Sequence, residues 1–122
     1  MPIIDSDIII NILRDKPGAI ERLRPYDTAD CAITAVNAME ILCGARNSDE
    51  CVRLDRFLSR FSLLQIDPDI SKLALLLVKK HAMSSGLHVA DALIAASALV
   101  YKAELLTENK RHFRQVDGLV LR

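Results

Sequence analysis

Short apolar runs alternate with longer amphipathic segments along the whole chain. Apolar residues between the runs recur at helical spacing, as Ile8, Ile9 and Ile12 do near the start. Five runs have the length and composition of buried β-strands: Ile3-Ile4, 31–33, 63–66, 104–107 and 119–121. Short buried strands that alternate with helices are typical of an α/β fold with a parallel sheet. We therefore expect an α/β protein with a central parallel sheet of about five short strands.

Polar residues indicate where several helices begin. Ser6 is expected to cap the first helix, and Thr34 the helix that follows the second strand. In that second helix, the apolar residues 36, 39 and 43 are the expected buried stripe. Two longer helices are predicted over 69–83 and 88–102. The second is apolar on almost every side and should therefore be central and buried.

Length and composition limit the class of protein. A chain of 122 residues is the size of one domain, so residues 1–122 are expected to form a single unit with no linker. Sixteen basic residues balance sixteen acidic ones, which argues against a protein that coats nucleic acid by bulk positive charge. Aromatic residues make up 4% and Trp is absent, which argues against a base-stacking platform for single strands.

The cysteines and the apolar segments suggest where the protein works. Cys31, Cys43 and Cys51 are an odd number, contain no CxxC pair and are expected to be reduced thiols. The start of the chain has no basic segment followed by a cleavage site. The longest nearly apolar stretch, 92–101, is far shorter than the roughly 20 residues of a spanning helix. We expect a cytoplasmic protein with no membrane partner.

Three carboxylates stand where the pattern predicts apolar surroundings. Asp5 ends the first strand, and ligands of open α/β sheets bind beyond the carboxyl ends of strands. Glu40 lies beside the expected buried stripe of its helix, four residues after Val36. Asp91 lies near the start of the most hydrophobic helix, where an unpaired carboxylate is costly. Each also has an ordinary explanation: a turn or cap residue, an exposed face, or a charge placed for the helix dipole.

A shared divalent cation would explain all three positions together. Carboxylates gathered in one crevice repel one another and raise one another's pKa values, and a hard cation relieves this repulsion. Mg²⁺ prefers oxygen ligands and binds through one or two carboxylates together with substrate phosphates. The lack of His or Cys among these positions argues against zinc.

Four segments of the chain resemble the PIN-domain ribonucleases, and within them the VapC-like toxins of type II toxin–antitoxin pairs. The segments, which keep the order and spacing of that family, are Ile3-Ile4-Asp5-Ser6, 38–45, 90–96 and 106–113. The resemblance spans nearly the whole chain. It implies a three-layer α/β/α sandwich whose acidic residues converge on one pocket that binds Mg²⁺ or Mn²⁺.

The family motif can be carried over residue by residue. Its four acidic positions fall on Asp5, Glu40, Asp91 and Asn109. Asn109 stands where many relatives carry Asp, which removes one charge and favours a one-metal mechanism. Ser6 and Thr107 match small hydroxyl positions of the pocket. Asn37 replaces the Ser or Thr that is usual three residues before the glutamate.

The resemblance also implies a reaction, namely metal-dependent hydrolysis of an RNA phosphodiester bond. Asp5 and Asp91 would hold the cation, Glu40 would position or deprotonate the attacking water or complete the coordination shell, and Asn109 would orient a water molecule. Other expected partners are a second copy of the chain and a small antitoxin that places a basic side chain in the acidic pocket. Candidates for RNA phosphate contacts are Arg14, Arg46, Lys110, Arg111 and Arg114.

Three alternatives are left open by the sequence. The first is a housekeeping PIN nuclease that acts in RNA maturation. The second is a phospho-receiver signalling domain, in which Asp67 after the third strand would be the phosphoacceptor. The third is a PIN fold that has lost activity and only binds, which the neutral Asn109 would allow.

Overall fold

The computed structural model describes residues 1–122, except for the side chain of Ser85. Its parallel sheet is made of β1 (Ile3–Ile4), β2 (Ala32–Thr34), β3 (Ser62–Leu64) and β4 (Leu105–Leu106), in the spatial order β3-β2-β1-β4. The predicted class is therefore confirmed, with one strand fewer than expected. Over the described backbone, the run 119–121 forms only a single bridge, between Leu121 and Leu105. Three backbone hydrogen bonds join this segment to β4 and the residue after it, but they produce only that one bridged pair.

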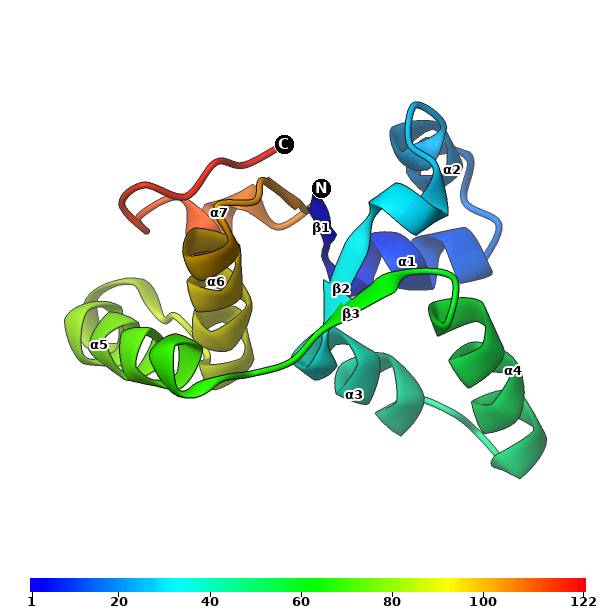
Figure 1. Cartoon of the computed structure of the whole chain (residues 1–122), viewed down its shortest axis with the longest axis horizontal. Coiled ribbons are helices and arrows are strands. Elements are labelled where there is room, and N and C mark those ends of the chain that lie inside the picture. Colours follow the sequence, from blue (N-terminus) through cyan, green and yellow to red (C-terminus); the bar gives the residue numbers. More distant parts are fainter.

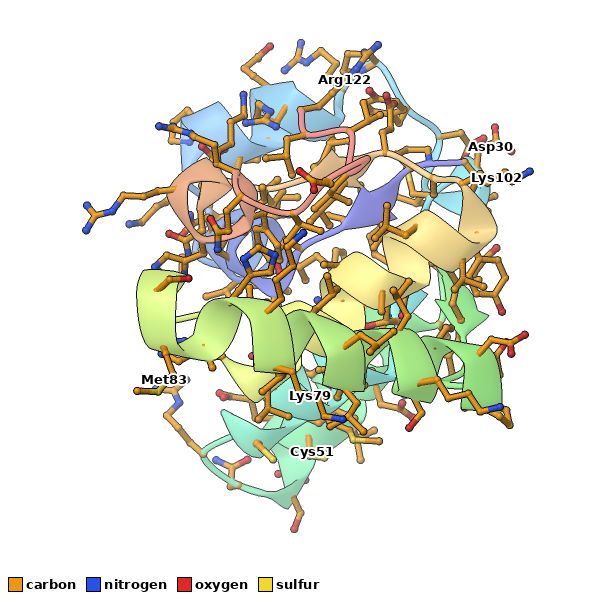
Figure 2. The ribbon with its side chains drawn as sticks, turned by 90° about the vertical axis from the view of Figure 1, so that its left-hand side faces the viewer. Asp30, Cys51, Lys79, Met83, Lys102 and Arg122 are labelled. Atoms are coloured by element: carbon orange, nitrogen blue, oxygen red, sulfur yellow. The ribbon has the colours of Figure 1, made fainter. Side chains whose placement is uncertain are left out.

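Helices cover both faces of the sheet (Figure 1). Successive strand residues point to opposite faces, so the two halves of each strand enter different cores. Ile3, Ala32 and Leu105 pack with the helices drawn on the left of Figure 1, whereas Ile4, Ile33 and Leu106 pack with those on the right. The left layer holds α5 (Pro68–Ser85) and α6 (Val89–Tyr101), and Figure 2 looks onto it. The right layer holds α1 (Ser6–Leu13), α2 (Pro17–Leu23), α3 (Ala35–Cys43) and α4 (Ser48–Leu58).

Two shorter helices complete the chain. The 3₁₀ helix η1 (Thr28–Asp30) leads into β2, and α7 (Lys110–Phe113) follows β4 and contacts α6. The three layers together are the α/β/α sandwich that the family resemblance implied. No helix in the described part of the chain has the length and hydropathy needed to span a membrane.

The helix starts differ from the prediction in one case. Asp5, and not Ser6, caps α1: its Oδ1 accepts a hydrogen bond of 2.8 Å from the Ser6 backbone N–H. Thr34 caps α3 as predicted and forms a reciprocal capping box with Asn37. The predicted central position of α6 is confirmed, because Ala92 and all of residues 94–98 are buried.

The predicted buried stripe of α3 is wrong. Met39 is 62% exposed and Cys43 is exposed, whereas Asn37 and Ile41 are buried. The expected stripe contained only apolar residues and therefore did not include Asn37, whose side chain is polar. Its amide groups are instead fully paired inside the protein, which removes the cost of burying them.

Candidate active site

The candidate site lies where the order of the strands reverses. From β1 the chain proceeds outward to β2 and β3, and then returns to place β4 on the other side of β1. Ligand sites of open α/β sheets lie at the carboxyl ends of strands beside such a reversal. Asp5 directly follows β1, Thr34 ends β2 and Thr107 directly follows β4. These positions bring polar side chains from distant parts of the chain to one edge of the sheet.

Asp5 is buried and held by hydrogen bonds on both of its oxygen atoms. Thr107 Oγ1 donates to Asp5 Oδ2 at 2.7 Å, and the Ser6 N–H donates to Oδ1. Burial raises the pKa of Asp5, and the negative charge of Asp91 raises it further. The hydrogen bonds from Thr107 and Ser6 and the nearby His112 oppose this rise in pKa. Asp5 is thus a fixed carboxylate in surroundings that favour a neutralising partner.

Glu40 is exposed on α3 and reaches back to the start of α1. Ser6 Oγ donates a 2.9 Å hydrogen bond to Glu40 Oε1. Desolvation raises the pKa of Glu40, the charges of Asp5 and Asp91 raise it further, and the Ser6 hydrogen bond lowers it. Residues 5, 40 and 91 therefore act on one another electrostatically, although they come from three separate elements.

Asp91 has two roles in the geometry of α6. Its Oδ2 accepts a 3.3 Å hydrogen bond from the His88 backbone N–H, so the carboxylate caps the helix. The same Oδ2 lies 3.5 Å from His88 Nδ1 and 3.8 Å from His112 Nδ1. The side chain keeps 18% exposure. Two imidazoles therefore flank Asp91, although no His was expected beside the carboxylates.

Asn37 is a positioning residue that the sequence argument did not use. It is completely buried, and its Nδ2 donates to Ser6 Oγ at 3.0 Å and to Asp5 Oδ1 at 3.5 Å. Its Oδ1 accepts from the Thr34 N–H at 3.0 Å and from Thr34 Oγ1 at 2.7 Å. Since Ser6 in turn donates to Glu40, Asn37 orients Glu40 indirectly, through Ser6. The Thr34–Asn37 spacing of a capping box was the sequence signal for this role.

Asp7 is a second residue that the sequence argument missed. It is half-buried, and burial together with the charge of Asp5 raises its pKa to about 6. Asp7 Oδ2 accepts a 3.2 Å hydrogen bond from the Glu108 N–H, and this contact ties α1 to the loop after β4. Its only sequence signal was its position two residues after Asp5.

The remaining predicted site residues lie after β4, on α7 and on a groove that includes Glu40. Asn109 is exposed, and its backbone N–H donates to Thr107 Oγ1 at 2.9 Å, so it helps to orient the hydroxyl that binds Asp5. Arg14, Arg46 and Glu40 line one groove of about 740 Å³ between α1, α3 and α4. Arg46 is paired there with Glu50 at 2.8 Å. Lys110 and Arg111 are exposed at the start of α7, and Arg114 ends it. That these basic side chains bind RNA phosphates stays a prediction.

The donor set fits a hard divalent cation. Asp5, Glu40 and Asp91 offer carboxylate oxygens, which Mg²⁺ and Mn²⁺ prefer. The raised pKa values of Asp5 and Glu40 reflect repulsion and desolvation that a bound cation would relieve. A second cavity, of about 440 Å³, lies at the opposite edge of the sheet, where Met1, Lys102 and Glu104 line it. None of the three site carboxylates lines that cavity.

Comparison with known proteins decides the family. A model of the PIN domain matches residues 3–119. The chain belongs to the PIN-domain family. Ribonuclease VapC19 of Mycobacterium tuberculosis is 34% identical over 122 residues, covering 98% of this chain and 97% of that protein. This PIN domain is not a phospho-receiver, and Asp67 instead caps α5 by accepting a 2.8 Å hydrogen bond from the Ile70 N–H.

Solved structures agree with the fold of this PIN domain. A toxin–antitoxin complex from Klebsiella pneumoniae contains a chain that matches with a TM-score of 0.83 and 27% identity, covering 98% of this chain and 96% of that chain. FitAcB from Neisseria gonorrhoeae matches with a TM-score of 0.82 and 21% identity, covering 100% of this chain and 97% of that chain. The second likeness shows the fold alone.

Proposed function

We propose that this PIN-domain protein is a divalent metal-dependent ribonuclease and the toxin of a toxin–antitoxin pair. The observation that carries the proposal is that carboxylates far apart in the chain meet at one place: Ser6 donates hydrogen bonds to both Asp5 and Glu40, and the charge of Asp91 acts on both of them. Its similarity to a protein named as a ribonuclease, over almost the full length of both, supports the reaction class. The similarity to a chain of a toxin–antitoxin complex supports the biological role.

The side chains divide the work of hydrolysis. Asp5 and Asp91 would hold Mg²⁺ or Mn²⁺, and the bound cation would supply polarisation of the phosphate and stabilisation of the charge that develops during cleavage. Thr107 and the Ser6 backbone keep Asp5 in one orientation. Glu40 accepts the proton of the attacking water, a role that its raised pKa favours. Asn109 orients a water molecule beside them.

The basic residues around the site bind the RNA backbone. Arg14 and Arg46 lie on the groove that includes Glu40, and Lys110 and Arg111 lie on the exposed start of α7. Contacts between basic side chains and phosphates position a nucleic acid without reading its sequence. Such local contacts suffice for a protein whose formal net charge is zero.

The antitoxin is the second partner. The groove between α1, α3 and α4 combines apolar residues such as Leu13 and Leu54 with Glu40 at its edge. A segment that lies in this groove can place a guanidinium against Glu40, where it takes over part of the cation's role.

The proposed place of action is the cytoplasm. Cys31, Cys43 and Cys51 are free thiols, which suits a reducing compartment.

A second copy of the chain is the third partner. Leu75 (56% exposed), Leu76 (60%) and Met83 (98%) share one solvent-facing side of α5 at helical spacing. Figure 2 shows α5 lying across this face of the molecule, with Met83 near its end. Lys72 and Lys79 lie on the same side of the helix, so this surface is apolar with basic side chains among the apolar ones. Exposed apolar side chains gathered on the outer side of a layer are typical of an interaction surface. We assign it to the homodimer.

The decisive experiment is RNA cleavage by the protein purified free of antitoxin. Wild-type protein with Mg²⁺ should cleave, and addition of EDTA should stop the reaction. Asp91→Asn should lower the rate by at least about 100-fold, because the loss of a ligand charge removes transition-state stabilisation. Asn can still cap α6, so circular dichroism should show an intact fold. Asp69→Asn, an exposed residue in the first turn of α5, is the matched control. Equal cleavage by Asp91→Asn would remove Asp91 from the mechanism.

A further inference from the structure

His88, Asp91 and His112 form a cluster of ligand atoms at the edge of the carboxylate site. One ligand atom from each residue lies within 4.8 Å of the other two. The two imidazole rings stand edge to face, with an interplanar angle of 90° and centroids 5.9 Å apart. Both Nδ1 atoms approach the same oxygen, Asp91 Oδ2. None of the roles proposed above requires either imidazole.

Helix capping explains only part of this cluster. The His88 backbone N–H binds Asp91 as a capping residue would, and the two residues are close in sequence. His112 comes from α7, which follows β4 in the chain, and no helix cap requires it beside Asp91. The fold therefore brings a second nitrogen ligand to Asp91 from a distant segment.

The spacing suits a tetrahedral transition-metal ion. Ligands bound at about 2.1 Å with tetrahedral angles lie about 3.4 Å apart. The two distances to Asp91 Oδ2, 3.5 Å and 3.8 Å, are close to that value. The side chain of His88 is 76% exposed, so its imidazole can turn toward a bound ion without disturbing the core. Imidazole nitrogens prefer Zn²⁺ to Mg²⁺, and Asp5 and Glu40 add negative charge nearby.

We propose that His88, Asp91 and His112 bind a transition-metal dication such as Zn²⁺, and that this ion competes with Mg²⁺ because both use Asp91. The second half of the proposal rests on the proposed ribonuclease function. The first half concerns binding alone. Three protein ligands leave a fourth position open, as in zinc sites that exchange a water molecule or an anion.

The binding experiment uses the full chain with Cys43→Ser and Cys51→Ser, which removes the exposed and half-buried thiols as competing zinc ligands. Calorimetric titration with Zn²⁺ in millimolar Mg²⁺ should give one tight site per chain. Co²⁺ should give a visible absorption band of low-coordinate geometry. His88→Ala and His112→Ala, each checked for folding by circular dichroism, should weaken Zn²⁺ binding at least about tenfold. Unchanged affinity in both variants would overturn the site.

The competition experiment measures RNA cleavage at fixed Mg²⁺ with increasing Zn²⁺. Wild-type protein should lose activity over the range in which calorimetry shows the site to fill, and His88→Ala should need at least about tenfold more Zn²⁺ for the same loss. Zinc binding with unaltered cleavage, or equal zinc inhibition of both proteins, would overturn the competition. If the protein cleaves no RNA with Mg²⁺ alone, the proposed function fails, whereas the calorimetric and Co²⁺ results still decide whether the site exists.

Discussion

Asn37 is a fully buried polar side chain whose hydrogen bonds connect three parts of the site. Its amide group contacts Thr34 at the end of β2, Ser6 at the start of α1 and the carboxylate of Asp5. A buried amide with all its groups paired costs little, but removal of one partner leaves the others desolvated without a hydrogen bond. The geometry of Glu40 depends on the same network through Ser6.

Asn37→Ala should therefore lower both stability and activity. We expect the free energy of unfolding to fall by about 2–3 kcal/mol, because buried groups of Thr34 and Asp5 lose a partner. Urea denaturation measures this change. Met39→Ala, on the same helix at a position that is 62% exposed, should change it by less than about 0.5 kcal/mol. Equal effects of the two substitutions would show that the Asn37 network contributes nothing to stability.

Asp7 makes stability depend on pH. Its pKa is about 6 in the folded protein, above the ordinary value of 3.8, because the folded state disfavours the charged form. Its contribution to stability is fully present below about pH 3.8 and is lost as the pH rises through 6.

Asp7→Asn should remove this loss. In EDTA, the unfolding free energy of the variant should fall less between pH 4 and pH 7 than that of the wild type. At pH 7 the variant should be more stable by about 1 kcal/mol, a value reduced for the partial exposure of Asp7. Urea denaturation at several pH values tests this, with Asp69→Asn as the exposed control. Parallel pH profiles of wild type and Asp7→Asn would contradict the prediction.

At the scale of elements, α6 sets the position of Asp91. The helix is buried on almost every side, and its small residues Ala92, Ala95 and Ala96 are completely inaccessible to solvent. It packs most extensively against α5 and also contacts α3, which carries Glu40. Small side chains allow this close approach, so a displacement of α6 would move Asp91 relative to Asp5 and Glu40.

Ala95→Leu should test this dependence. Three extra carbon atoms in a filled core should cost about 2 kcal/mol of stability. The RNA cleavage rate should also fall, because the start of α6 can no longer keep its place. Ala82→Leu, at an exposed position on α5, makes the same chemical change and should leave both stability and cleavage nearly unaltered. A fully active and stable Ala95→Leu protein would show that the core around α6 accepts a larger side chain without moving Asp91.

For the whole molecule, the layers could be predicted better than the local geometry. Ile3-Ile4 and the apolar segment 88–102 indicated a buried parallel sheet and a central helix, because burial on all sides leaves an unbroken apolar run. Asp5, Glu40 and Asp91 could be singled out as carboxylates in apolar surroundings. Asn37 could not, because its burial depends on partners supplied by β2 and α1.

The histidines were hidden for a similar reason. His88 and His112 are 24 positions apart in sequence, and only the packing of α7 against α6 brings them to Asp91. The strand count failed at residues 119–121, where three backbone hydrogen bonds beside β4 yield only one bridged pair. Hydrophobic pattern indicates which residues are buried, but not which neighbour a buried or half-buried polar group will find.

The exposed stripe on α5 gives a prediction for the whole molecule. Sedimentation of the wild-type protein should give twice the 13.6 kDa mass of one chain. Leu76→Glu should give the mass of one chain, because a charge cannot be buried unpaired in an apolar interface. Val52→Glu, at an equally exposed position on α4, should remain dimeric. A dimer that Leu76→Glu leaves intact would assign the interface to another face.

The late position of β4 in the chain has a consequence for synthesis. The hydroxyl that holds Asp5 belongs to a residue 102 positions further along, and β1 lacks its neighbour on that side until Leu105 and Leu106 arrive. A chain that ends before residue 105 therefore lacks both the neighbour of β1 and the hydroxyl that orients Asp5, so the carboxylate site can form only after that segment has been made.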